Sequence, residues 1–243
     1  MREEIYYQML KEDDTIWRSV ATRKMLLTFW KKYRTPKNNY RVFELGPGGG
    51  ATLRFFEKFG KVYGLDTSEI AVQYCRERGI SNVILNGGST LPLKDNSFDL
   101  CLAVDVIEHI KDDQQAMNEL YRVCTHGGIV LTVIPAFQFL WSDRDVRLGH
   151  YKRYTGDEIR LLAENAGFRI QKLSYINLFY LPFLWFAVKI KKGRVKTDVA
   201  TLPKSFNWLL VKMLGVETIL LKRMDFAIGC STIMVALKDG NRK

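Results

Sequence analysis

The residues best suited to chemistry begin with a glycine-rich run, VFELGPGGG at residues 42–50. Glycine has no Cβ, so such a run can turn tightly and bring its backbone N–H groups close to a ligand. Gly46, Gly48 and Ala51 also have the G-x-G-x-x-G/A spacing of dinucleotide-binding loops, which is a weak signal on its own. A phosphate-binding P-loop is excluded, because no Gly-Lys-Ser/Thr follows the run.

Two carboxylates narrow the choice of ligand. Asp66 lies about twenty residues after the first glycine, at the end of the next predicted strand, where an acid accepts hydrogen bonds from vicinal ribose hydroxyls. This position suits a nicotinamide or flavin dinucleotide and S-adenosylmethionine alike. Glu44 favours S-adenosylmethionine, because dinucleotide folds usually keep an apolar strand residue there and a carboxylate attracts the ammonium of a methionine moiety.

A further reactive group follows the fourth predicted strand, in the sequence DVIEHI. We expect Asp105, Glu108 and His109 to begin a helix at the mouth of the site. His109 is a candidate general base, which is needed when the nucleophile carries a proton, as a hydroxyl does. Two alternatives stay open. In one, Glu108 interacts with the helix dipole and His109 packs against a loop; in the other the group binds a metal, with His150 as the only other plausible histidine.

The loop of residues 136–154 leaves the carboxyl end of the fifth predicted strand, so it faces the same site. Its cations alternate with aromatic residues, which is typical of a loop that binds an anionic or sugar-bearing group. A solvated charged surface is the alternative. The expected substrate-binding residues are Trp141, Arg144, Arg147, Tyr151 and Arg153, and His150 and Tyr154 join His109 as catalytic candidates.

Strands and helices alternate along the chain, which predicts an α/β fold with a doubly wound parallel sheet. Ligands of such sheets bind at the carboxyl ends of the strands. Thr155, Glu158 and Gly167 provide the capping box and the end of one helix. The predicted strands are residues 40–45, 61–66, 81–85, 97–106, 127–135, 168–176 and 230–238, and the helices are residues 15–33, 51–59, 68–79, 112–124 and 155–167.

The amino-acid composition indicates the cellular compartment and the charge of the expected partner. The 243 residues carry a net charge of +11, which suits an anionic partner such as nucleic acid, a membrane surface or a phosphorylated substrate. The four cysteines are scattered without a C-x-x-C, as expected for reduced packing residues. The polar, acidic N-terminus does not resemble a signal peptide, so we expect a cytoplasmic protein.

Residues 178–227 form an insertion between the last two predicted strands. The chain is therefore expected to have three parts: an N-terminal helical segment (1–36), a main domain (37–177 and 228–243) and this insertion. Its apolar stretch is too short to span a bilayer and is interrupted by Pro182. An amphipathic helix follows at residues 205–223. Apolar surface beside cations predicts a contact with an anionic membrane, with a lid or a dimer interface as alternatives, and it argues against a nucleic-acid groove. The cations are Lys189, Lys191, Lys192, Arg194 and Lys196.

Four stretches together resemble class I S-adenosylmethionine-dependent methyltransferases over roughly residues 40–177: VFELGPGGG, VYGLDTSEIAVQYCRERG, LPLKDNSFDLCLAVDVIEHI and GGIVLTVIP. The resemblance implies a Rossmann-like, seven-stranded, mostly parallel sheet with an antiparallel last strand. It implies S-adenosylmethionine as cofactor, with S-adenosylhomocysteine as product. The cofactor-binding residues that it carries over are Glu44, Gly46, Gly48, Gly50, Asp66, Thr67, Ser68 and Asp105. Where many relatives place an adenine-binding aspartate this chain has Gly87, so Asn86, Ser89 or a backbone group takes that role.

The tail and the GHYKRYT sequence resemble bacterial and archaeal methyltransferases of the type-11 group that are linked with glycan or lipid assembly. This implies methyl transfer to a hydroxyl of a small, sugar-type or lipid-linked acceptor, by a monomer or homodimer on the inner face of the membrane. The alternatives are a protein or nucleic-acid methyltransferase and a protein that binds the cofactor without turnover. The D-x-x-E-H spacing resembles the ion-binding set of some RNA and quinone-ring O-methyltransferases, but we assign no metal from it.

Overall fold

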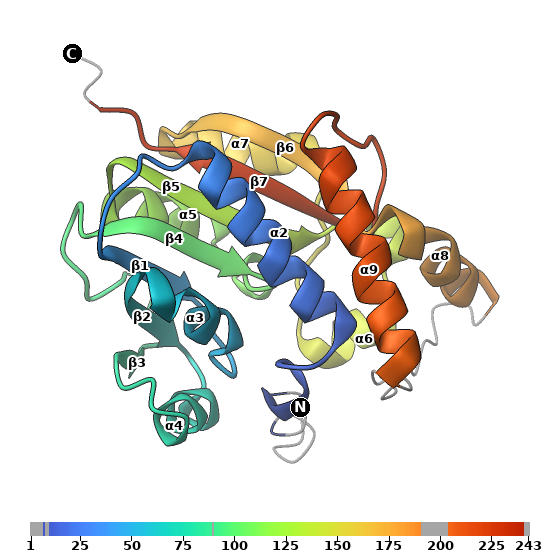
Figure 1. Cartoon of the computed structure of the whole chain (residues 1–243), viewed down its shortest axis with the longest axis horizontal. Coiled ribbons are helices and arrows are strands. Elements are labelled where there is room, and N and C mark those ends of the chain that lie inside the picture. The colour runs from blue at the N-terminus through green and yellow to red at the C-terminus, as the bar shows by residue number, and fades with distance from the viewer. Residues whose placement is uncertain (1–6, 8–9, 89, 191–203, 241–243) are drawn as a thin grey trace.

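The computed structural model describes residues 7, 10–88, 90–190 and 204–240, and within them seven strands form one sheet in the order β3-β2-β1-β4-β5-β7-β6 (Figure 1). Only β7 is antiparallel to its neighbours β5 and β6, while the other described pairs are parallel. This confirms the predicted doubly wound α/β fold. The strands are β1 (Tyr40–Leu45), β2 (Gly60–Asp66), β3 (Val83–Leu85), β4 (Phe98–Val104), β5 (Cys124–Pro135), β6 (Arg169–Ile176) and β7 (Ser231–Leu237).

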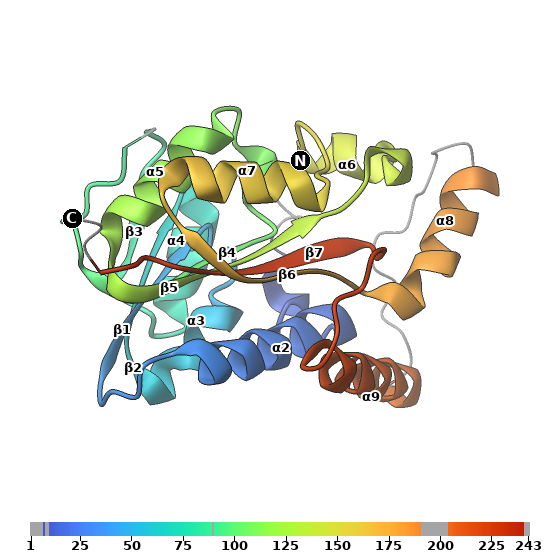
Figure 2. The same ribbon diagram turned by 90° about the horizontal axis from the view of Figure 1, so that it is seen from above.

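Helices cover both faces of the sheet (Figure 2). One buried cluster joins one face of the sheet to α2, α3 and α4, and a second joins the opposite face to α5 and α7. Both faces of the central strands are therefore apolar, as parallel strands under two helical layers require. The described helices are α2 (Trp17–Tyr33), α3 (Ala51–Phe56), α4 (Glu69–Glu77), α5 (Asp113–Val123), α6 (Asp143–Leu148), α7 (Gly156–Ala166), α8 (Leu181–Ile190) and α9 (Lys204–Leu221).

The N-terminal helix α2 packs on the sheet and also against α9 from the insertion. Phe29 and Trp30 are fully buried in the core, while Trp17 packs with Leu214 of α9. Asn207 of α9 ties the start of α2 in place: its Oδ1 accepts from the Trp17 backbone N–H at 2.8 Å, and its Nδ2 donates to the Thr15 carbonyl at 2.9 Å. Segments far apart in the sequence thus form one helical layer, as Figure 1 shows.

The structure corrects two local predictions next to the site. The helix expected to begin at Asp105 is a single 3-10 turn, η2 (Ile107–His109), and α5 begins later, capped by Asp112. The predicted loop 136–154 contains a 3-10 turn, η3 (Gln138–Leu140), and the short helix α6. Ser142 and Asp145 form a capping box at the start of α6, so local polar contacts order this segment.

Candidate active site

A cavity of about 450 Å³ opens where β1, β2 and β4 end, as expected for a doubly wound sheet. The glycine run forms one wall of it. α2 and the residues before it form a second wall, and the turn after β4 together with α6 forms a third. The charged and imidazole side chains that line the cavity are Asp13, Arg18, Arg23, Glu44, Asp66, Asp105, Glu108, His109, Arg144 and His150.

The glycine run needs glycine for two reasons. Gly46 and Gly50 have φ of +64° and +71°, in the left-handed region that other residues rarely adopt. A Cβ on Gly46 would lie 2.4 Å from Val106 Cγ2, and a Cβ on Gly50 would lie 2.7 Å from Ile80 Cδ1. The backbone therefore comes closer to its neighbours than any side chain would allow. Gly46, Gly48 and Gly49 line the cavity, whereas the predicted residue Gly50 is not among the lining residues.

Asp66 ends β2 and is held by the same glycine run. Its Oδ2 accepts a hydrogen bond from the Gly48 N–H at 3.0 Å, and its Oδ1 accepts from the Ser68 N–H at 2.9 Å. Burial raises the pKa of Asp66. A carboxylate has about four acceptor sites, so both oxygens can still accept from a ligand's hydroxyls. Thr67 and Ser68 line the cavity beside it, and Ser68 also caps α4 by accepting from the Ala71 N–H.

Glu44 presents an unpartnered carboxylate oxygen in the interior. The residue is 2% exposed, and its Oε2 has no hydrogen-bond partner among the described residues. Burial, and after it the charge of Asp13, raise the pKa of Glu44 to about 8. A side-chain hydrogen bond from Thr52 acts on the same carboxylate and lowers its pKa. A buried carboxylate oxygen without a partner is costly unless a cation or donor compensates it. Glu44 therefore fits the ammonium group of a methionine-type ligand.

Asp105 links the sheet to α2. It follows β4 with a φ of +49°, a strained value for a residue other than glycine. Its Oδ2 lies 3.3 Å from Arg18 Nη1, and Oδ1 has no partner among the described residues. The charge of Asp105 raises the pKa of Arg18. Sequence reasoning missed Arg18, because no local pattern indicates that α2 reaches the site.

A group of two imidazoles and a carboxylate lies at the edge of the cavity. Glu108 is fully buried, and the rings of His109 and His150 lie with their centroids 4.6 Å apart at 88°. Burial, then the charge of Asp105, raise the pKa of Glu108, whereas burial, then His150, lower the pKa of His109. His109 is consequently a neutral imidazole at neutral pH, which can accept a proton or bind a metal ion.

Two residues predicted to act on the substrate are buried and make internal contacts. Arg153 is buried, and its Nε and Nη2 donate to the two oxygens of Asp145 at 2.8 and 3.1 Å. Tyr154 is buried, and its hydroxyl donates to Asp113 at 2.8 Å. Burial, then the hydrogen bond to Asp113, raises the pKa of Tyr154 far above its usual value. Both side chains hold the segment in place.

The remaining predicted residues divide between the cavity and its surroundings. Arg144 lines the cavity, where burial, then the charge of Arg18, lower its pKa to about 10. Tyr151 and Arg147 are exposed and Trp141 is half-buried, and none of the three is among the residues that line the cavity. Ser89 lies outside the described residues.

Residues 43–132 match the family described as a methyltransferase domain. A protein of Mycolicibacterium smegmatis named "Probable S-adenosylmethionine-dependent methyltransferase" is 34% identical over 129 residues, which cover 52% of this chain and 50% of that protein. The demethylmenaquinone methyltransferase of Geobacillus stearothermophilus is 38% identical over 99 residues, which cover 38% of this chain and 42% of that protein. The chain spans about half the length of the curated relatives it matches.

Solved structures share the fold at low sequence identity. A chain from the complex between the Trm112 methyltransferase activator of Haloferax volcanii and a methyltransferase aligns with a TM-score of 0.65 and 16% identity, over 99% of this chain and 97% of that one. Phosphoethanolamine N-methyltransferase 2 of Haemonchus contortus, solved with S-adenosyl-L-methionine, aligns with a TM-score of 0.59 and 21% sequence identity. The alignment covers 88% of this chain and 52% of that one. Residues 43–132 thus match a methyltransferase-domain family, and the chain shares the fold of these solved structures.

Proposed function

We propose that this chain is an S-adenosylmethionine-dependent methyltransferase that methylates a hydroxyl of a small, sugar-type or lipid-linked acceptor. The observation that supports it best is the buried carboxylate of Glu44, one oxygen of which has no partner among the described residues, in the cavity that also contains the glycine run and Asp66. A carboxylate for an ammonium, a close backbone approach and an acceptor for ribose hydroxyls match three parts of S-adenosylmethionine. When bound, this cofactor supplies a methyl group already activated on a sulfonium.

In the proposed complex the chain mainly binds, orients and excludes water. Glu44 holds the ammonium, the glycine run lies along the methionine part, and Asp66 accepts from the ribose hydroxyls. Asp105 borders the methyl group, since it follows β4 at the cavity and is fixed by Arg18. These roles agree with the orphaned oxygen of Glu44 and with the free acceptor sites of Asp66.

The acceptor side of the cavity supports a hydroxyl substrate. A hydroxyl must lose its proton as the new O–CH₃ bond forms and the S–CH₃ bond breaks, so a group that helps the proton leave has to be close. His109 lies in the cavity wall beside His150 and Glu108, and its imidazole can accept the hydroxyl proton. Arg144 in the same wall suits an acceptor that carries an anionic group.

Calorimetry with S-adenosylhomocysteine tests the cofactor proposal. We expect the wild-type protein to bind this ligand and Asp66→Ala to bind it about 1–3 kcal/mol more weakly, because two ribose hydroxyls lose their acceptor. The control Asp157→Ala, an exposed aspartate away from the cavity, should bind like the wild type. A wild-type protein that binds NAD but not S-adenosylhomocysteine would refute the proposal.

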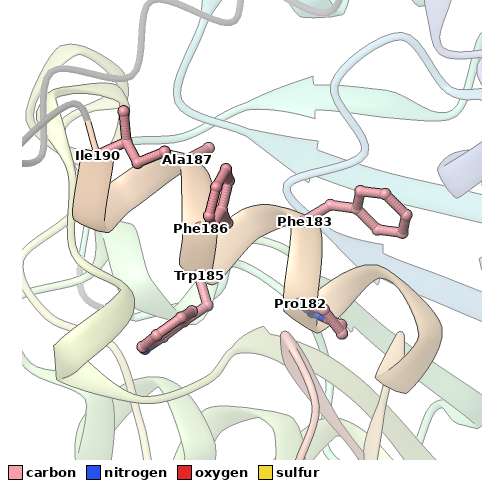
Figure 3. A pocket seen from close by; sticks show the side chains of 6 residues that line it. All are labelled: Pro182, Phe183, Trp185, Phe186, Ala187 and Ile190. Atoms are coloured by element: carbon pink, nitrogen blue, oxygen red, sulfur yellow. The ribbon is translucent and has the colours of Figure 1, made fainter.

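We further propose that the end of the molecule carrying α8 and α9 contacts an anionic membrane surface. A surface hollow of about 590 Å³ is lined by six residues of α8: Pro182, Phe183, Trp185, Phe186, Ala187 and Ile190. Figure 3 labels these side chains on the helix. Phe183 is 69% exposed and Phe186 is 60% exposed. Trp208 on α9 is also exposed, with Lys212 beside its ring. No helix in the described ranges is long and apolar enough to cross a membrane.

Cations accompany these apolar side chains, as contact with anionic lipid requires. Lys189 lies over the Trp185 ring at 5.9 Å. The predicted cations Lys191, Lys192, Arg194 and Lys196 follow it in the sequence but lie outside the described residues. Apolar side chains and cations thus occur together in one part of the chain, which favours an anionic bilayer over an uncharged partner.

Vesicle sedimentation tests the membrane contact. We expect the protein to sediment with anionic vesicles more than with neutral ones, and less as salt rises, because screening acts over about 8 Å at physiological salt. Replacing Lys189, Lys191, Lys192, Arg194 and Lys196 with glutamine should weaken sedimentation. A charge-matched control replaces Arg41, Lys58, Lys61, Arg76 and Lys94, all exposed and distant in sequence from the insertion, and should sediment like the wild type. Wild-type protein that stays in the supernatant at low salt would contradict the proposal.

A further inference from the structure

We propose that Glu108, His109 and His150 form a binding site for one divalent metal ion. One ligand atom from each of the three side chains lies within 4.8 Å of the other two. The sequence separates His150 from the other two by about forty residues, and α6 with its following turn brings it back to η2. The Tyr151 N–H donates to the Glu108 carbonyl at 2.8 Å, which fixes the two segments together.

Glu108 is the observation that points to a ligand. Its side chain is fully buried, and neither carboxylate oxygen has a hydrogen-bond partner among the described residues. Buried carboxylates are ordinarily paired, hydrogen-bonded or bound to a metal. His150 Nε2 lies 4.0 Å from Glu108 Oε1, which is too far for a hydrogen bond. An ion between these atoms would satisfy both.

Both imidazoles are already oriented for metal binding. His150 Nδ1 donates to Asp145 Oδ1 at 2.9 Å, so its Nε2 is left to act as a ligand. His109 hydrogen-bonds the backbone of Gly149 through its ring, which fixes that ring as well. Histidines that bind metals almost always donate their other N–H to a carboxylate or carbonyl in this way.

The arrangement favours a first-row transition ion or zinc over magnesium or calcium. Two imidazoles and one carboxylate suit Zn²⁺, Fe²⁺, Co²⁺ or Mn²⁺, whereas Mg²⁺ and Ca²⁺ prefer ligand sets made of oxygen. Ligands about 2.1 Å from a tetrahedral ion are roughly 3.4 Å apart, so atoms that lie within 4.8 Å of one another must close by up to about 1.4 Å around it. Asp105 stays outside this group, because Arg18 already pairs with it.

The position of the site indicates what the ion would do. Three protein ligands leave at least one coordination position open, and the site lies in the wall of the cavity. With an ion bound, His109 would be a ligand and not a base. A hydroxyl oxygen bound to the ion would have a lowered pKa, so its proton could pass to water before methyl transfer. This last step depends on the proposed function, whereas ion binding itself does not.

The test measures ion binding without cofactor or turnover. Cobalt(II) is titrated into the metal-free protein and followed by its visible absorption, and Zn²⁺ is titrated by calorimetry. We expect one ion per chain in the wild type. Glu108→Gln, His109→Ala and His150→Ala should each lose more affinity than the roughly 10–100-fold that an outer hydrogen-bond partner contributes. The matched control is His126→Ala, the third histidine, which is exposed and hydrogen-bonds the Asp239 carbonyl instead.

The outcomes separate this inference from the function proposed above. A wild-type protein that binds no ion, or three variants that bind it as tightly as the wild type, would overturn the metal site. Equal loss in His126→Ala would also overturn it, because the binding would then not be at this group. S-adenosylhomocysteine binding, measured on the same samples, shows that each variant is folded and tests the cofactor proposal independently.

Discussion

Replacing Glu44 with glutamine should weaken S-adenosylhomocysteine binding by about 2–5 kcal/mol, or roughly 30- to 5,000-fold. Removing one partner of a buried charge pair has an effect of this size. The ligand's ammonium would then be buried without a carboxylate. Calorimetry on wild type and variant measures the difference. Glu57→Gln is the matched control, since Glu57 is exposed and lies outside the cavity.

The same carboxylate should make binding depend on pH. In the free protein the pKa of Glu44 is about 8, so at pH 6–7.5 it is mostly protonated. Pairing with an ammonium lowers that pKa, so binding releases a proton and the affinity rises with pH by up to about tenfold per unit. The rise ends near pH 8, because above the pKa of Glu44 in the free protein the carboxylate is already ionised and no proton is released on binding.

Two buffers with different ionisation enthalpies report the released proton directly. Close to one proton should be released by the wild type at pH 7, and close to none by Glu44→Gln. If the wild-type affinity stays constant from pH 6 to 7.5, Glu44 is not the group that receives the ammonium.

Asp145→Ala should lower the free energy of unfolding by about 3–5 kcal/mol, because it leaves a buried charge without its partner. Asp145 is fully buried and accepts from both Arg153 and His150, as well as from Ser142. Without it the Arg153 guanidinium keeps one hydrogen bond, at 3.3 Å to the Ala136 carbonyl. Denaturant unfolding, monitored by circular dichroism, measures the change.

Two further variants identify the cause of that loss. Asp143→Ala on the same helix is the control, because Asp143 is exposed, and it should change stability by less than about 1 kcal/mol. The double variant Asp145→Ala, Arg153→Met removes both charges and should be more stable than Asp145→Ala alone. A double variant that is no more stable would show that the unpaired guanidinium is not the reason.

The sequence determined those features that depend on neighbours along the chain. Alternating strand and helix patterns predicted the sheet, because apolar periodicity and caps act over a few residues. The capping box from Thr155 to Glu158 is present as predicted, and so is the left-handed Gly167 that ends α7. Asp66 lies at the end of β2 as predicted, and the parallel pairing of β1 with β2 places it beside the glycine run.

Tertiary structure decided which distant residues meet at the site. Arg18 reaches Asp105 only because α2 packs across the strand ends, and His150 reaches Glu108 only because α6 turns the chain back. The same packing buried Arg153 against Asp145, although its sequence neighbourhood resembles an exposed binding loop. A charged residue has no local periodicity that distinguishes a ligand contact from an internal ion pair. Its role follows from which side chains come within a few ångströms once the core has formed.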